Sequence, residues 1–135
     1  MEDDNSEILV GNNLSVQPGT HIAAGEGTTI CIGDDCMFSG DVEMRSTDSH
    51  SICDLSSRRR TNKAKEIRIG NHVWLTAHVR ILKGATIAGH CIVGNSSVVT
   101  GNLDTPHAVY AGNPCKLLKQ NIEWDRKKID LLPER

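Results

Sequence analysis

The sequence predicts an all-β solenoid made of short strands. Between Ile69 and Asp104, six consecutive hexads each open on a branched aliphatic residue, and the fifth place of each is mostly small or apolar. This period fits neither a helix, at about 3.6 residues per turn, nor a plain strand alternation. It fits a coil of three short sides, each directing one aliphatic side chain inward. The opening residues are Ile69, Leu75, Ile81, Ile87, Val93 and Val99, and the fifth places are Val73, Val79, Ala85, Cys91, Ser97 and Leu103.

Length and composition agree with this fold. The 135 residues suit one domain over 1–135, and aromatic residues make up only 3% of the chain, as a narrow aliphatic core requires. A net charge of −2 argues against nucleic acid or an anionic membrane as the main partner. We expect no transmembrane segment and no signal peptide. Five cysteines without paired spacing predict free thiols in a reducing cytoplasm.

The same period is visible earlier in the chain. Val10, Val16 and Ile22 lie six apart, and after four extra residues near 25–28 the frame resumes at Ile32. Because three hexads form an 18-residue coil, we expect about four to five coils, over residues 8–48 and 67–104.

The pattern breaks between Met44 and Ile69, where residues 49–66 are polar and basic. We predict a loop that protrudes from the coils, and a long loop inside a compact repeat is usually functional. Arg58, Arg59 and Arg60 are either a solvated loop tip or a site for an anionic ligand.

Residues 105–135 are expected to cap the solenoid, since an open coil exposes its backbone edge and its apolar section. Gly112 and Pro114 indicate a turn, and Pro114 suits the start of a helix. The predicted cap is a short C-terminal α-helix, followed by an exposed, charged tail from Asp125 to Arg135. One face of this helix would carry Leu117, Leu118, Ile122 and Trp124.

Three segments resemble the hexapeptide-repeat acyltransferase superfamily. Ser46-Thr-Asp-Ser-His-Ser-Ile52 is similar to its catalytic-histidine segment, and Ile69-Gly-Asn-His-Val-Trp-Leu75 and Val109-Tyr-Ala-Gly-Asn-Pro-Cys-Lys116 to two further typical blocks. The nearest resemblance is to the O-acetyltransferases of bacterial capsular polysaccharide and polysialic acid, followed by the maltose and galactoside acetyltransferases. It implies a left-handed parallel β-helix and a homotrimer with active sites between subunits. It also implies acetyl-CoA as co-substrate and a carbohydrate acceptor.

His50 is the predicted general base. A sugar hydroxyl is a weak nucleophile, and an imidazole can take its proton and pass it to the departing thiolate. By counting from Met44, the alternative is a histidine at an inward coil position. Asp48, Asp54 or a backbone carbonyl would orient the imidazole, although each aspartate is equally suited to a loop turn.

Trp74 follows His50 by 24 residues, which resembles the paired His and Trp of the polysialic acid O-acetyltransferases. The indole would pack on the pantetheine arm or the sugar, or donate its N–H near the thioester oxygen. The alternative is a tryptophan that packs against one corner of a coil.

The resemblance also implies a donor site. Backbone groups would meet the pantetheine, and two lysines would meet the phosphates as point charges. Gly101 departs from the pattern, because the family usually carries a lysine there. The lysines are alternatively solvated surface residues. The implied positions are Ala77, Asn95, Thr100, Gly101, Lys116 and Lys119.

His72 and His90 are 18 apart and should stack on successive coils. The zinc-binding γ-class carbonic anhydrases have a related fold, but their histidine spacing does not occur here, so we expect no metal site. Three rival functions fit the same repeat: an acetyltransferase for an amine or small xenobiotic, a metalloenzyme similar to the γ-class carbonic anhydrases, and a non-catalytic trimerisation module.

Overall fold

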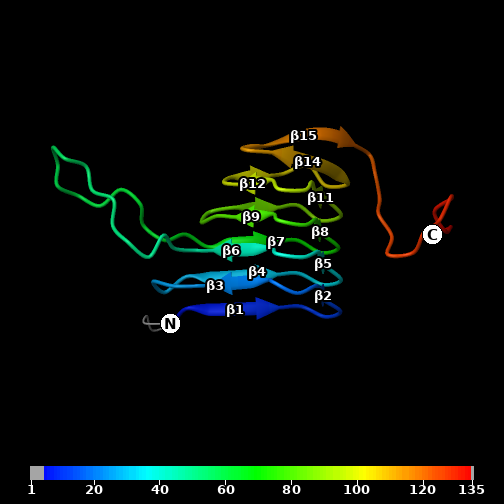
Figure 1. Ribbon diagram of the computed structural model, residues 1–135, viewed down its shortest axis with the longest axis horizontal. Coiled ribbons are helices and arrows are strands. Elements are labelled where there is room, and N and C mark those ends of the chain that lie inside the picture. The colour runs from blue at the N-terminus through cyan, green and yellow to red at the C-terminus, as the bar shows by residue number, and fades with distance from the viewer. Residues whose placement is uncertain (1–4, 135) are drawn as a thin grey trace.

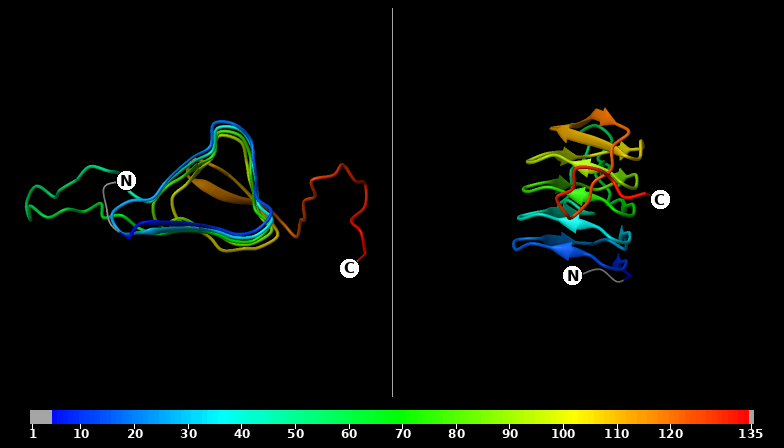
Figure 2. Two further views of the ribbon diagram at one scale, coloured as in Figure 1. Left: turned by 90° about the horizontal axis from the view of Figure 1, so that it is seen from below. Right: turned by 90° about the vertical axis from the view of Figure 1, so that its right-hand side faces the viewer.

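The chain winds into a stack of triangular rungs (Figures 1 and 2). The computed structural model describes residues 5–134, and within them are fifteen strands and no helix. No helix long and apolar enough to cross a membrane is therefore present in that range. The predicted all-β class with parallel sheets is confirmed.

Each side of the triangle is one sheet. Among the described residues, neighbouring strands of the three sheets pair in parallel, except the two most C-terminal strands, which are antiparallel. Sheet A contains β1 (Glu7–Val10), β4 (Thr29–Ile32), β7 (Ile67–Ile69), β10 (Thr86–Ile87) and β13 (Asn102–Leu103). Sheet B contains β2 (Ser15–Val16), β5 (Met37–Phe38), β8 (Trp74–Leu75), β11 (Ile92–Val93), β14 (Ala108–Gly112) and β15 (Cys115–Gln120). Sheet C contains β3 (His21–Ala23), β6 (Glu43–Arg45), β9 (Arg80–Ile81) and β12 (Val98–Val99).

The inward positions are those that the hexads predict. Ile69 pairs with Ile32 below and Ile87 above, so identical positions of successive rungs stack. All six opening residues and all six fifth-place residues from Ile69 to Leu103 are buried. The first rung differs, because Val10 and Val16 are 48% and 46% exposed and no described strand lies beneath them.

The three corners differ in what leaves them. We call the corner between sheets C and A the loop corner (residues 24–28, 46–66, 82–85 and 100–101). The corner between sheets A and B is the tail corner (residues 11–14, 33–36, 70–73, 88–91 and 104–107). In Figure 2 the segment between β6 and β7 projects from the loop corner, and the C-terminal segment leaves on the other side of the triangle, at the tail corner.

The predicted C-terminal helix is wrong. Residues 115–120 form β15, which turns back at Gly112 and pairs antiparallel with β14. The φ of Gly112 is 110°, a conformation that other residues rarely adopt. A hairpin satisfies the free backbone edge of β14 directly, which a helix over the same residues would leave open. The solenoid is therefore capped as expected, but by a strand.

We expect Ile81→Ala to lower the free energy of unfolding by about 2–5 kcal/mol, because it empties a fully buried core position. Urea denaturation followed by circular dichroism, at a fixed protein concentration, measures this. The matched control is Ile52→Ala in the loop, where the side chain is 61% exposed and the change should stay within about 0.5 kcal/mol. Equal losses in both variants would contradict the assignment of the core.

Candidate functional site

The loop that carries His50 is ordered by hydrogen bonds between its two sides. Its two sides run antiparallel, with Thr61 N–H donating to the Ile52 carbonyl at 2.7 Å and Asp54 N–H donating to the Arg59 carbonyl at 2.8 Å. An isolated bridge pairs Cys53 with Arg60. These contacts hold the loop in one shape although most of its side chains are exposed.

Asn62 fixes the backbone around His50. This side chain is buried, and its amide N–H groups donate to the His50 carbonyl at 2.8 Å and to Asp48 Oδ2 at 3.0 Å. Its Oδ1 accepts from the Ile52 N–H at 2.8 Å. Sequence reasoning missed Asn62, because its partners lie 10 to 14 residues away and share no local motif with it.

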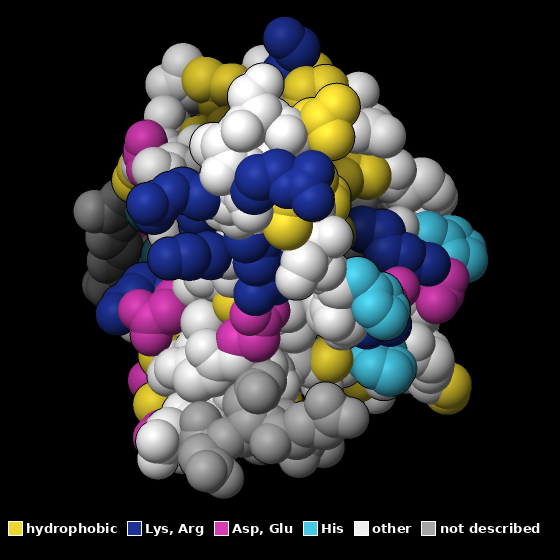
Figure 3. Space-filling model, turned by 90° about the vertical axis from the view of Figure 1, so that its left-hand side faces the viewer, with side chains coloured by type: hydrophobic (Ala, Val, Ile, Leu, Met, Phe, Trp, Pro, Cys, Tyr) yellow, Lys and Arg dark blue, Asp and Glu magenta, His cyan; other side chains and the backbone are white. Residues whose placement is uncertain are grey.

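An ion pair ties the base of the loop to the rung below. Arg60 Nη2 donates to Glu26 Oε2 at 2.9 Å, and the Thr47 hydroxyl donates to the same carboxylate. The hydrogen bond from Arg60, followed by that from Thr47, lowers the pKa of Glu26 from 4.5 to about 2. Arg60 is thus a loop anchor, whereas Arg58 and Arg59 are exposed near the loop tip. Lys and Arg side chains gather over this face of the molecule (Figure 3).

The His50 side chain is exposed, and no hydrogen bond or ion pair of its ring occurs among residues 5–134. Both candidate orienting carboxylates have other partners. Asp48 Oδ2 lies 2.8 Å from Lys83 Nζ, and this contact, followed by that of Asn62, lowers the pKa of Asp48. Asp54 Oδ2 accepts from the Ser57 N–H at 2.7 Å in a loop turn, which lowers the pKa of Asp54.

Trp74 lies outside the coil on sheet B, away from the loop. Its indole N–H donates to Ser39 Oγ at 3.2 Å, and its ring is tilted against Trp124, with the ring centroids 5.9 Å apart. Trp124 belongs to the C-terminal segment, which leaves at the tail corner (Figure 2). A single chain therefore does not bring His50 and Trp74 together.

The predicted donor residues occupy two neighbouring corners and the cap. Thr100 and Gly101 lie at the loop corner, whereas Ala77 and Asn95 lie at the corner between sheets B and C. Lys116 and Lys119 are exposed on β15. Position 101 does not require a glycine. An added Cβ would meet no atom within 4 Å, and the φ of Gly101 lies outside the left-handed region. A lysine would therefore fit at this position.

The tail corner carries a second polar cluster, and the predicted stacking of His72 on His90 is confirmed, with ring centroids 5.1 Å apart. Glu123 of the C-terminal segment joins them, and one ligand atom from each of these three residues lies within 4.8 Å of the others. Glu123 could not be linked to the histidines from the sequence, because the C-terminal segment has no fixed register with the rungs.

No family model matches the chain. It is 36% identical over 130 residues to a polysialic acid O-acetyltransferase of Escherichia coli O1:K1 / APEC, which covers 96% of this chain and 42% of that protein. It is 42% identical over 120 residues to the polysialic acid O-acetyltransferase of Neisseria meningitidis, which covers 85% of this chain and 56% of that protein. The chain is a homologue of these enzymes. It spans about half the length of these curated relatives.

Solved structures agree with this homology. The structure of the polySia-specific acetyltransferase NeuO superposes on this chain with a TM-score of 0.88. The two are 35% identical, and the match covers 93% of this chain and 58% of that chain. A galactoside acetyltransferase in complex with coenzyme A has the same fold, with a TM-score of 0.65 and 24% identity over 91% of this chain and 72% of that chain. The resemblance to hexapeptide-repeat acetyltransferases is confirmed.

We expect the Glu26 carboxyl to titrate at about pH 2, well below 4.5. Because its pKa is lowered in the folded chain, the anchoring it provides is complete above pH 4.5 and is lost as the pH falls towards 2. The side-chain carboxyl shift of Glu26, followed by NMR, measures the midpoint.

Arg60→Gln should move that midpoint towards 4.5, whereas the matched change Arg45→Gln, in a residue that pairs with Glu43, should leave it in place. A parent chain whose Glu26 titrates near 4.5 would show that the loop is not anchored in this way.

Proposed function

We propose that this chain is an acetyl-CoA-dependent O-acetyltransferase that moves an acetyl group to a sugar hydroxyl of a cell-surface glycan or its precursor. The observation that carries the proposal is the anchored loop, which presents an exposed His50 in a chain homologous to polysialic acid O-acetyltransferases. Residues 1–135 would act as one domain, because the loop and the C-terminal segment both contact the rungs.

In the proposed reaction, His50 accepts the proton of the acceptor hydroxyl while that oxygen attacks the thioester carbonyl. The carbon–sulfur bond then breaks, and the imidazolium returns the proton to the departing thiolate. The acetyl group passes directly from sulfur to oxygen in a ternary complex, without an acyl-enzyme. Asp48, Asp54 or a backbone carbonyl would orient the imidazole; on the single chain Asp48 contacts Lys83 and Asp54 accepts from the Ser57 N–H.

We infer a left-handed homotrimer in which the active site forms between subunits. The separation of His50 and Trp74 on one chain supports this, because the loop of one subunit would have to reach sheet B of its neighbour. Trp74 would then face the thioester or the sugar, although its present partners are Ser39 and Trp124.

The donor would lie along the rungs towards the C-terminus, in contact with the loop corner, the corner between sheets B and C, and the cap. Backbone groups of Ala77, Asn95, Thr100 and Gly101 would meet the pantetheine, and Lys116 and Lys119 the phosphates. The galactoside acetyltransferase of the same fold binds coenzyme A, which supports this co-substrate. All five cysteines of the chain are free, which suits the cytoplasm, where the acetyl donor is made.

His50→Ala should lower kcat by about 10²–10⁴-fold, because the hydroxyl loses its general base, and should leave acetyl-CoA binding nearly unchanged. Thiol release from acetyl-CoA across a panel of oligosaccharides and amines, with a no-acceptor blank, measures the rate. The control is His21→Ala, an exposed histidine on the first rung. An unchanged rate in His50→Ala would exclude His50 as the base, and a preference for amines would replace the sugar as acceptor.

Mixing two inactive variants tests the inter-subunit site. His50→Ala and Trp74→Ala, unfolded together and refolded at equal amounts, should recover about a quarter of the parent activity, because a random trimer joins an intact His50 to an intact Trp74 at that frequency. The same amounts of each variant refolded alone are the control. No recovery, or a monomer by light scattering, would contradict the shared site.

A further inference from the structure

Three histidines form a ladder along the tail corner. His72, His90 and His107 occupy the same corner position on successive rungs, with φ values of 53°, 60° and 53°. Side chains of Asn, Asp and His tolerate this left-handed backbone better than most. The ring centroids of His72 and His90 are 5.1 Å apart, and those of His90 and His107 are 4.5 Å apart. The rungs thus align three imidazoles.

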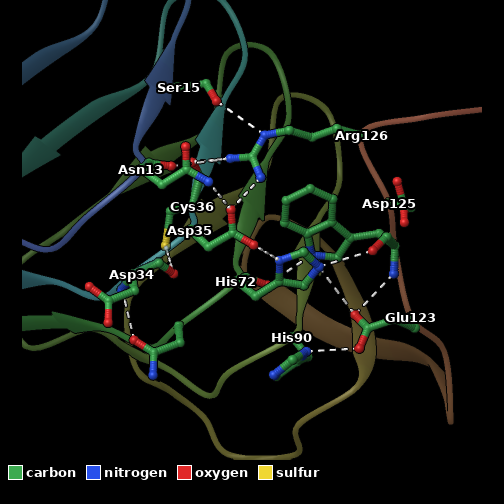
Figure 4. A network of polar contacts seen from close by, with 12 residues as sticks. Asn13, Ser15, Asp34, Asp35, Cys36, His72, His90, Glu123, Asp125 and Arg126 are labelled. Atoms are coloured by element: carbon green, nitrogen blue, oxygen red, sulfur yellow. Dashed lines mark hydrogen bonds and ion pairs between the residues drawn. The ribbon is translucent and has the colours of Figure 1, made fainter. Parts of the chain in front are cut away.

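The C-terminal segment places one carboxylate against His72 and His90 of this ladder (Figure 4). Glu123 Oε2 lies 2.8 Å from His90 Nδ1 and 3.6 Å from His107 Nδ1. Glu123 Oε1 lies 3.4 Å from His72 Nε2. Ligand atoms of a tetrahedral zinc site, with bonds of about 2.0–2.1 Å, are separated by roughly 3.3 Å. The spacing around Glu123 is therefore close to that of a coordination shell.

His72 faces oxygen atoms with both ring nitrogens. Nδ1 lies 2.7 Å from Asp35 Oδ2, and Nε2 lies 2.9 Å from the Trp124 carbonyl as well as near Glu123. A neutral imidazole has one N–H and one nitrogen lone pair in the ring plane, so that lone pair would point at an acceptor oxygen. A cation at Nε2, either a proton or a metal ion, removes this conflict. Asp35 is placed as the carboxylate that typically orients a metal-binding histidine through its other nitrogen.

Neighbouring residues hold this arrangement in place. Trp124 stacks flat on His72, with ring centroids 3.8 Å apart and an interplanar angle of 5°. Arg126 donates to the Cys36 carbonyl at 2.9 Å and pairs with Asp35. Asp35 is thus held between His72 and Arg126.

Against the expectation from the histidine spacing, we propose that His72 Nε2, His90 Nδ1 and the Glu123 carboxylate bind one Zn²⁺ ion, with His107 or water as the fourth ligand. Two imidazoles and one carboxylate are a donor set that suits zinc. The ion fastens the C-terminal segment to the rungs, because the histidines belong to the rungs and Glu123 to the segment. The ion takes no part in the proposed acetyl transfer; its function is to hold the segment, whose Trp124 packs against Trp74.

Isothermal titration of the full chain with ZnCl₂, after treatment with a chelator, tests the proposal. The expected result is one Zn²⁺ bound per chain, with affinity at least tenfold weaker in both His90→Gln and Glu123→Gln. Asp35→Asn should weaken it by about 10- to 100-fold. His78→Gln is the matched control. His78 also pairs with an aspartate, but the equivalent position on the next rung is Ser96, so no second histidine stacks on it.

Absorption of the Co²⁺-loaded chain identifies the ligands. The expected spectrum has ligand-field bands of a nitrogen- and oxygen-bound ion and no thiolate charge-transfer band. A thiolate band would assign the metal to a cysteine and overturn the proposal. So would the absence of Zn²⁺ binding in the parent chain, equal binding in Glu123→Gln and the parent, or an equal loss in His78→Gln.

Discussion

Stacking of identical rungs is the constraint on which this structure depends. Each rung hydrogen-bonds to the next through parallel strands, and each side must direct an apolar side chain into a narrow interior. A residue that faces inward is therefore restricted in size and polarity by the rungs above and below it. The polar chemistry of the molecule lies on outward positions and at the corners.

Polar side chains gather at the corners because of the backbone conformation there. A sharp bend between two sides places one residue in the left-handed region, and Asp35, His72 and His90 occupy this conformation at the tail corner. The same geometry repeats on every rung, so the side chains that suit it form a column. At the loop corner the column is interrupted, and ion pairs from Glu26 and Lys83 hold the inserted segment.

The period of six was enough to predict the inward positions, because burial in a solenoid depends on spacing along the chain. The break after Met44 likewise indicated a protruding loop. The prediction of a C-terminal helix was wrong because Leu117, Leu118 and Ile122 have the spacing of a helical face. The residues form a strand instead, because they pair with the free backbone edge of β14, which lies outside that segment. Asn62 and Glu123 were missed for the same reason, since their partners are distant in sequence.

The place at which the loop interrupts the coil has a consequence for the diversity of this architecture. Ile32 still stacks on Ile69 although 37 residues of chain separate them, because the extra residues leave and return at one corner. The segment is thus a replaceable insertion: an exchange between related chains would change the surface around His50 while the rungs keep their register.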